Sequence, residues 1–151
     1  MISCDTNILF PACDATSVHH QAARAFLACY RDDNQFCLCE QVLMELYVLL
    51  RNPTVCQNPL SAADATSVIQ AFRSNPRWRV VDVVLDKSIP EMVWREAGQN
   101  GFAYRRIFDI RLAATLLHHG VTDFATRNGK DFAKLGFTRV WDPLKTFPET
   151  R

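Results

Sequence analysis

The sequence has little of several features that would place it in a specialised class. Its net charge is only +1, from 17 basic and 16 acidic residues, which excludes a protein that holds nucleic acid by bulk charge alone. Its longest apolar run, residues 42–50, is interrupted by Glu45 and is far shorter than the ~20 residues that a membrane span requires. The first residues contain no basic leader, so we expect no signal peptide, no membrane partner and a cytoplasmic protein.

The six cysteines are not arranged as a binding motif either. They stand at positions 4, 13, 29, 37, 39 and 56, with no CxxC pair and no histidine at zinc-finger spacing. A chain of 151 residues buries roughly 70% of its unfolded surface and needs no disulfides. We therefore expect reduced, mostly buried thiols. Cys37 and Cys39 share one face of an expected strand, which leaves an adventitious metal or oxidation site open there.

Hydrophobic periodicity predicts strands that alternate with helices. The expected strands cover residues 1–4, 36–39, 78–85, 121–126 and 138–141, where apolar and β-branched residues cluster. The expected helices cover residues 18–30, 41–50, 61–73, 87–99 and 107–119, with a helical turn at 130–135 and a polar turn at 5–7. This order favours one domain over residues 1–151, an α/β sandwich around a mainly parallel sheet.

Four carboxylates lie where the local pattern calls for another residue type or where an expected strand ends. Asp5 and Asp131 follow the ends of strands, which is the edge at which open parallel sheets bind ligands. Glu45 and Asp109 stand in strongly apolar helical segments, where a buried charge is costly unless it is paired or bound to a metal. The four positions are therefore candidates for chemistry.

Each of these acids also has an ordinary structural alternative. The acid at position 5 fits an Asx turn, and the two later aspartates fit helix caps. Glu45 fits an ion pair with Arg24 or Arg51. Taken together, however, the four acids can converge at one sheet edge, where their mutual repulsion calls for a cation. Carboxylate oxygens select Mg²⁺ or Mn²⁺ over zinc, and such an ion beside arginines suits phosphodiester hydrolysis.

Four segments, in this order, resemble those of PIN domains, and in particular those of the VapC-type toxins of prokaryotic toxin–antitoxin pairs. They are residues 2–7 (ISCDTN), 41–46 (QVLMEL), 109–114 (DIRLAA) and 125–132 (ATRNGKDF). Each segment alone is a weak signal, but four of them at these distances are specific. The resemblance implies a PIN-like α/β/α fold and a metal-dependent endoribonuclease that is the toxin of such a pair.

The resemblance also implies roles for individual residues. Asp5, Glu45 and Asp109 would be the catalytic acids and would hold Mg²⁺ or Mn²⁺. Supporting hydrogen bonds would come from Thr6, Asn7 and Thr126.

The fourth acid of the family is where this chain departs from the pattern. Many relatives carry an aspartate at the position that Asn128 holds here. We favour Asp131 for the fourth catalytic position and retain Asn128 as a supporting polar contact. RNA phosphates would be bound by the basic residues that flank the acids, which are Arg105, Arg106, Arg111, Arg127 and Lys130.

Partners also follow from the resemblance. It implies an RNA substrate, either transfer or ribosomal RNA, a cognate antitoxin protein and a homodimer. Phe72, Trp78 and Trp94 are candidates for the surface that binds the antitoxin or the second copy.

Other functions are weighed against this one. The departure at Asn128 supports a catalytically silent PIN-fold binding module. A haloacid-dehalogenase-like phosphatase would need a second aspartate where this chain has Asn7. A small-molecule binder at the same sheet edge has no glycine-rich phosphate loop to support it.

Overall fold

A single parallel sheet organises the chain. The computed structural model describes residues 1–146, so the last five residues of the expected domain lie outside the description. The strands stand in the order β3-β2-β1-β4-β5, and every neighbouring pair is parallel. They are β1 (Ile2–Cys4), β2 (Phe36–Cys39), β3 (Arg79–Val81), β4 (Asp123–Ala125) and β5 (Arg139–Trp141).

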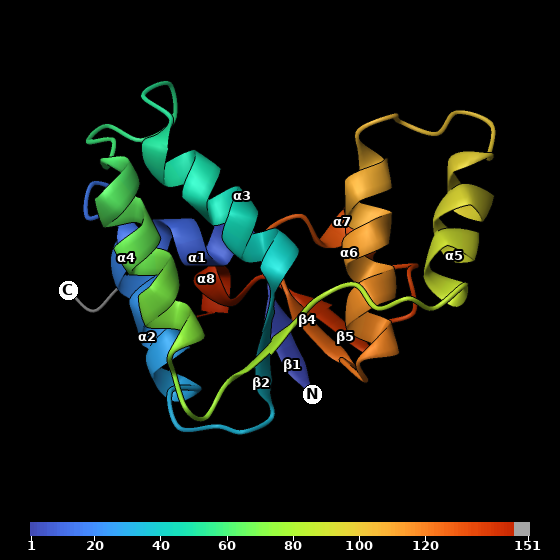
Figure 1. The fold of residues 1–151 in the computed structure, drawn as a ribbon, viewed down its shortest axis with the longest axis horizontal. Helices are drawn as coiled ribbons and strands as arrows, with labels where there is room; N and C mark the ends of the chain where they lie inside the picture. Colours follow the sequence, from blue (N-terminus) through green and yellow to red (C-terminus); the bar gives the residue numbers. More distant parts are fainter. Residues whose placement is uncertain (147–151) are drawn as a thin grey trace.

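Helices flank this sheet, as the expected α/β sandwich requires. They are α1 (Thr6–Cys13), α2 (His20–Cys29), α3 (Glu40–Arg51), α4 (Ala62–Arg73), α5 (Ser88–Ala97), α6 (Arg106–His118), α7 (Gly129–Phe132) and α8 (Pro143–Thr146). Figure 1 shows α2, α4 and α8 on one side of the sheet and α5 and α6 on the other, with α1 and α3 above the strands. Helices thus cover a sheet whose central strands are apolar.

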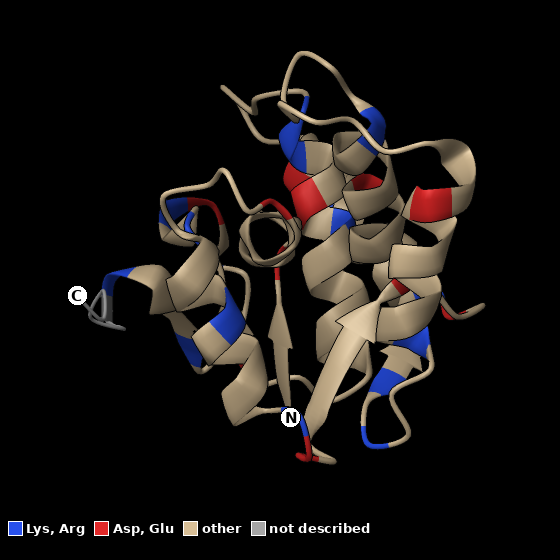
Figure 2. Ribbon diagram, turned by 90° about the vertical axis from the view of Figure 1, so that its left-hand side faces the viewer, with Lys and Arg blue, Asp and Glu red and all other residues tan. Residues whose placement is uncertain are grey.

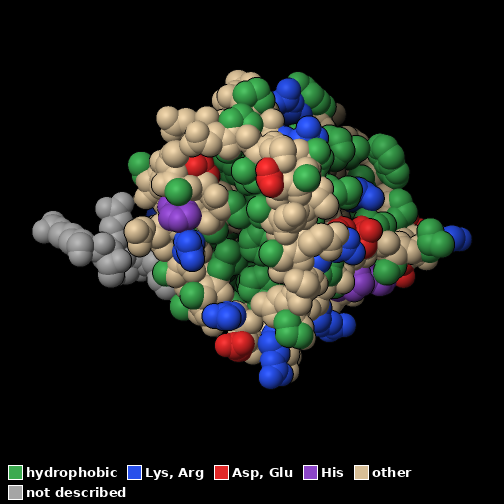
Figure 3. Space-filling model, turned by 60° about the vertical axis from the view of Figure 1, so that its left-hand side comes forward, with side chains coloured by type: hydrophobic (Ala, Val, Ile, Leu, Met, Phe, Trp, Pro, Cys, Tyr) green, Lys and Arg blue, Asp and Glu red, His purple; other side chains and the backbone are tan. Residues whose placement is uncertain are grey.

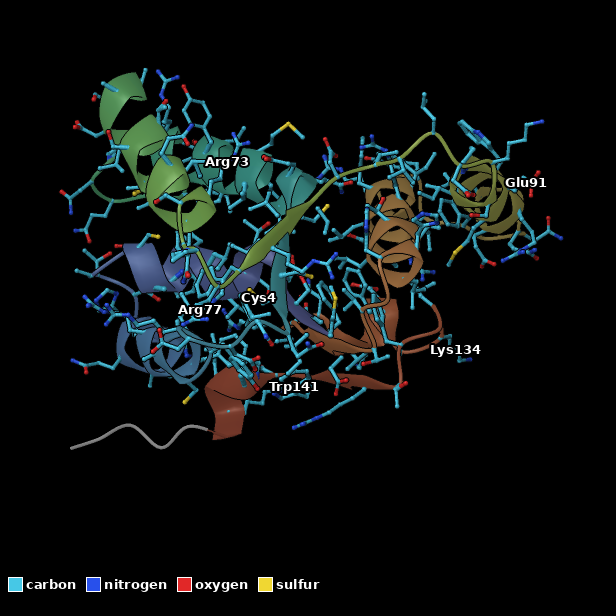
Figure 4. All side chains as sticks on the ribbon, turned by 60° about the horizontal axis from the view of Figure 1, so that its bottom comes forward. Cys4, Arg73, Arg77, Glu91, Lys134 and Trp141 are labelled. Carbon is cyan, nitrogen blue, oxygen red and sulfur yellow. The ribbon has the colours of Figure 1, made fainter. Side chains whose placement is uncertain are left out.

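The core sits between the central strands and the helices that cover them. All four residues of β2 are buried. Phe36 on β2 and Phe124 on β4 are both fully buried. Burying one phenylalanine stabilises the fold by about 1.5–3 kcal/mol. Figure 4 shows Cys4 at the centre of the molecule, whereas Glu91 and Lys134 lie at its outside. The strand ends are therefore anchored in the best packed part of the protein.

The cysteines are free thiols, as expected. Cys4, Cys37 and Cys39 are fully buried, and burial raises the pKa of the Cys37 thiol to about 11. A thiol that stays protonated is a poor metal ligand and a slow nucleophile. The adventitious metal or oxidation site left open at Cys37 and Cys39 therefore has no support.

The segment after β1 is a helix, where the sequence predicts only a polar turn. Asp5 has an extended backbone and serves as the N-cap residue of α1, and its carbonyl accepts a hydrogen bond from the Ile8 amide at 3.0 Å. The Asp-Thr-Asn turn is thus the first turn of a short helix that contains Pro11. Helix α8 was likewise not predicted from the sequence.

The expected strand at residues 78–85 is shorter than predicted. Pairing with β2 ends at Val81, opposite Cys39, and Leu85 is fully exposed. Strand β3 is the edge of the sheet, so no further strand holds the chain after Val81 and it turns away toward α5. The run of β-branched residues correctly located the strand but not its end.

Candidate active site at the carboxyl ends of the strands

The strands end level with one another, which places the residues after them at one edge. Cys4 lies opposite Ala125 in the β1–β4 pair, and Ala125 lies opposite Trp141 in the β4–β5 pair. The Asp5 amide donates to the carbonyl of Ala125 at 2.9 Å, which extends the pairing by one residue. In Figure 2, acidic positions lie beyond the arrowheads of the strands, near basic ones.

Asp5 is the buried centre of this edge. It is 8% exposed, and Thr126, which follows β4, is fully buried beside it. The Thr126 hydroxyl donates to Asp5 Oδ2 at 2.6 Å, and Asn7 Nδ2 donates to the same oxygen at 2.7 Å. Asn7 Nδ2 also donates to Thr126 Oγ1 at 3.1 Å. The three side chains form one hydrogen-bonded unit that fixes the orientation of the carboxylate.

The loop after β4 is tied to this unit through its backbone. The Arg127 amide donates to Asn7 Oδ1 at 3.0 Å, and the Asn128 amide donates to Thr126 Oγ1 at 3.0 Å. The side-chain amide of Asn7 therefore bridges α1 and the loop after β4.

Glu45 lies on α3, and the structure corrects the expectation that its charge is buried. The sequence predicts a helix buried all round, but Met44 and Val48 are 56% and 59% exposed and Glu45 is exposed as well. Its Oε2 accepts a hydrogen bond from the Thr6 hydroxyl at 2.9 Å. Among residues 1–146 Glu45 has no ion pair, so neither arginine proposed from the sequence neutralises it.

Asp109 lies in the first turn of α6, where it is half-buried. Burial is the main reason why the pKa of its carboxyl is raised, and the negative charges of Asp131 and Glu45 raise it further, whereas Arg106 lowers it. Acids from α3, α6 and α7 are thus close enough to repel one another.

A cleft of about 830 Å³ is lined by three of the four candidate acids, which are Asp5, Glu45 and Asp109. The pKa of Asp5 is raised to about 6, mainly by burial and also by the charges of Glu45 and Asp109, although the hydrogen bond from Thr126 lowers it. Asn128 also lines this cleft, whereas Asp131 does not.

The donor chemistry of the cleft fits a hard divalent cation, because all of its acids offer oxygen ligands and the negative charge of Glu45 raises the pKa of both Asp5 and Asp109. As the side chains stand in residues 1–146, no three acidic, histidine or cysteine residues are grouped closely enough to hold an ion. Glu45 and Asp109 are the acids with room to move, because they are more exposed than Asp5.

The five basic residues expected to bind RNA have different surroundings. Arg105 and Arg127 are exposed and line the cleft. Lys130 is exposed on α7 but does not line the cleft. Arg111 donates to Gln41 Oε1 at 3.4 Å and borders a separate groove beside α5.

Arg106 is placed inward rather than toward the cleft. It is half-buried, and its Nη2 donates to the backbone carbonyl of Asp131 at 3.2 Å. Its Nε is buried and has no partner among the described atoms. This geometry ties α6 to α7 and does not match a phosphate-binding role.

Two residues that sequence reasoning does not single out as functional also shape the cleft. Gln41 and Phe108 line it, and Gln41 Nε2 donates to the Phe108 carbonyl at 3.0 Å. Phe108 is 63% exposed, although its place in an apolar helical segment suggests a core residue. No feature of the linear pattern predicts that exposure.

Comparison with known proteins identifies the family. The family model of the PIN domain matches residues 2–138. Ribonuclease VapC24 of Mycobacterium tuberculosis is 48% identical over 144 residues, which cover 95% of this chain and 97% of that protein. The chain belongs to the VapC ribonucleases of the PIN-domain family. The nucleases of this family typically depend on a metal ion.

Solved structures support the same fold for this PIN domain. The Mycobacterium tuberculosis toxin VapC20, described as cleaving the sarcin-ricin loop, matches with a TM-score of 0.64 at 19% identity, over 88% of this chain and 94% of that one. A chain of a toxin–antitoxin complex from Klebsiella pneumoniae matches with a TM-score of 0.58 at 21% identity, over 95% and 98%. No helix within residues 1–146 has the length and apolar character to cross a membrane.

Proposed function

We propose that this chain hydrolyses RNA phosphodiester bonds in the cleft at the strand ends, with Asp5, Glu45 and Asp109 as the acids that hold Mg²⁺ or Mn²⁺. The observation that carries the proposal is the state of Asp5. Its carboxylate is buried, is oriented by two donors, and has a pKa raised to about 6 by burial and by two neighbouring acids. A carboxylate in such surroundings is stabilised by a cation.

Each part of the cleft has a task in this reaction. The cation, when bound, supplies activation of water and stabilisation of the charge on the leaving oxygen. Thr126 holds the Asp5 carboxylate in one orientation, and Thr6 does the same for Glu45. The exposed guanidinium groups of Arg105 and Arg127 bind the phosphates on either side of the scissile bond.

The fourth polar position is shared in this proposal. Asn128 lines the cleft and can offer a neutral oxygen. Asp131 contributes charge from behind Asp109, whose pKa it raises.

The proposed partner is a cognate antitoxin, and the proposed place for it is a hollow between α2 and α4. This hollow of about 320 Å³ is lined by Phe72 and Trp78, and Arg24 and Arg31 also border it. Figure 3 shows hydrophobic side chains gathered in a hollow at the centre of the face that carries α2 and α4. A hollow that combines aromatic rings with two arginines suits an amphipathic helix with acidic residues.

The antitoxin site is tested by co-purification of this chain with a candidate antitoxin. We expect Phe72→Ser to weaken the complex at least about tenfold, because a buried aromatic anchor is worth about 2 kcal/mol or more. Val55→Ser is the matched control, since Val55 is exposed outside the hollow. Equal retention by both variants would locate the partner elsewhere.

The ribonuclease proposal is tested with purified protein and total cellular RNA, in Mg²⁺, in Mn²⁺ and in EDTA. Discrete fragments are expected with either metal and none in EDTA, and Asp5→Asn and Asp109→Asn should remove them. Glu91→Gln is the matched control, because Glu91 is exposed on α5, away from the sheet centre (Figure 4). Cleavage that persists in both aspartate variants would reveal a contaminant or a different site. A folded wild-type chain that cuts nothing would favour the silent binding module.

A further inference from the structure

The cleft has an apolar wall that phosphate chemistry alone does not explain. Apolar side chains line the cleft together with the acids, and they are Phe10, Val48, Leu49, Phe108 and Leu112. Phe108 is 63% exposed. Leaving a phenylalanine in water rather than burying it costs about 1.5–3 kcal/mol, so an exposed ring inside a functional cleft points to a ligand that covers it.

The backbone under Phe108 is held in place. Gln41 on α3 donates to its carbonyl at 3.0 Å, and Arg111 on α6 donates to the other end of the Gln41 amide at 3.4 Å. The ring therefore stands on a first helical turn that is linked to α3. A platform of this kind loses little entropy when a flat ligand stacks on it.

Phe108 also stands next to the groups that handle phosphate. Arg105, the N-cap residue of α6, precedes Phe108 by three residues, which places the two side chains next to each other on the helix surface. Asp109 follows Phe108 directly and is turned about 100° from it around the helix axis. All three line the same cleft. A nucleotide offers the matching pair of features, a flat base and a phosphate a few ångströms away.

We infer that the cleft binds an unpaired nucleotide whose base stacks on Phe108 while its flanking phosphate lies against Arg105. The inference rests on the proposed ribonuclease function and deepens it, because it names the side chain that holds the base beside the bound phosphate. A base in a duplex already stacks on its neighbours and does not reach an aromatic side chain. A second copy covering Phe108 would be the rival occupant, but it would close the cleft over the acids.

The first measurement is RNA binding by the Asp5→Asn variant in EDTA, which serves as the parent because it should not cut its ligand during the measurement. Fluorescence anisotropy follows a labelled random-sequence RNA of about 12 nucleotides, either single-stranded or annealed to its complement. The parent should bind the single strand more tightly than the duplex. Adding Phe108→Leu should weaken single-strand binding about 5- to 150-fold, the effect of losing one stacked base, whereas Phe108→Trp should retain it.

A matched control removes an exposed aromatic outside the cleft. Trp94→Leu on α5 lines a different groove and should leave RNA binding unchanged. Light scattering gives the mass of every variant. A lower mass for Phe108→Leu would mean that a second copy covers Phe108 and would overturn the inference.

Two further outcomes separate this inference from the ribonuclease proposal. If the parent binds no single-stranded RNA, or Phe108→Leu binds it as tightly as the parent does, the stacking role is wrong. The wild-type chain could still cut RNA in the metal-dependent assay, in which case the ribonuclease proposal stands. A wild type that cuts no RNA contradicts the ribonuclease proposal itself.

Discussion

The candidate site has two parts that differ in how rigidly their acids are held. The strand-end half contains Asp5, which follows β1, and the helix-borne half contains Glu45 on α3. Asp5 is buried and receives hydrogen bonds from Asn7 and Thr126. Glu45 is exposed and receives one such bond, from Thr6. The first arrangement follows from backbone register, which sheet pairing fixes to within a residue. The second depends on side-chain rotamers, which a bound cation can still adjust.

This difference predicts where the largest loss of activity lies. We expect Asp5→Asn to reduce RNA cleavage about 100- to 1,000-fold, the range seen when one charge-stabilising group is removed from an active site. The helix-borne Glu45→Gln should lose less, because a neighbouring oxygen ligand can take over part of its role. Initial rates on one RNA at saturating Mg²⁺ compare the two variants. A larger loss for Glu45→Gln would reverse the comparison.

Among the acids of the site, Asp5 should also contribute most to the pH dependence of stability in the metal-free protein. The pKa of Asp5 is raised from 3.8 to about 6 in the folded state, so the folded chain binds a proton more tightly than the unfolded chain does. Asp5 therefore lowers the free energy of unfolding as pH rises from about 4 to 6, by on the order of 3 kcal/mol, with no further change above that range.

Urea unfolding in EDTA measures this dependence. Asp5→Asn should unfold at higher urea than the wild type at pH 7, and the gap should close as pH falls toward 4. A gap that stays constant across that range would show that burial does not perturb this carboxyl.

Thr126 tests whether orientation of the buried carboxylate matters apart from its presence. Thr126→Val keeps the shape but removes the donor to Asp5 Oδ2. Loss of such a supporting hydrogen bond typically lowers activity about 10- to 100-fold. Thr126→Ser, which keeps the hydroxyl, is the control and should restore most of the rate. Equal activity in both variants would show that the hydrogen bond is dispensable.

The smallest effect is expected at the fourth polar position. Asp131→Asn should lower cleavage less than about tenfold, because Asp131 does not line the cleft and acts on Asp109 only through charge. Asn128→Asp adds a carboxylate to the cleft lining and should lower the Mg²⁺ concentration that gives half-maximal activity. Cleavage rates measured over a range of Mg²⁺ concentrations compare the two variants with the wild type. A large loss of activity for Asp131→Asn would indicate that Asp131 is a metal ligand.

Much of the fold was predictable from the linear pattern. The alternation of strands and helices follows from hydrophobic periods of about 2 and 3.6 residues, which local sequence encodes. Helix α1 was missed because Asp-Thr-Asn is equally good turn and N-cap chemistry, and Pro11 argues against a helix. The end of β3 was missed because pairing with β2, and not the valine run itself, decides where the strand stops.

The residues of the candidate site can likewise be separated into those that the sequence predicts and those that it does not. Asp5 could be singled out in the sequence because it follows the end of an expected strand, where parallel sheets bind ligands. Glu45 and Asp109 could be singled out because charges in apolar surroundings are costly, although Glu45 proved to be exposed. The inward turn of Arg106 and the exposure of Phe108 could not. Both depend on contacts between elements far apart in the chain, such as the bond from Arg106 to the Asp131 carbonyl.

Local composition and segment order are enough to specify the α/β class, the family and the acids at the ends of strands, because these properties reside in neighbouring residues. Which groups share the cleft is decided by tertiary structure alone. Strand register sets Thr126 against Asp5, and the placement of α3 and α6 around one cleft brings the Gln41 side chain to the Phe108 carbonyl. These pairs are separated by 121 and 67 residues, and only the folded backbone brings them within hydrogen-bonding distance.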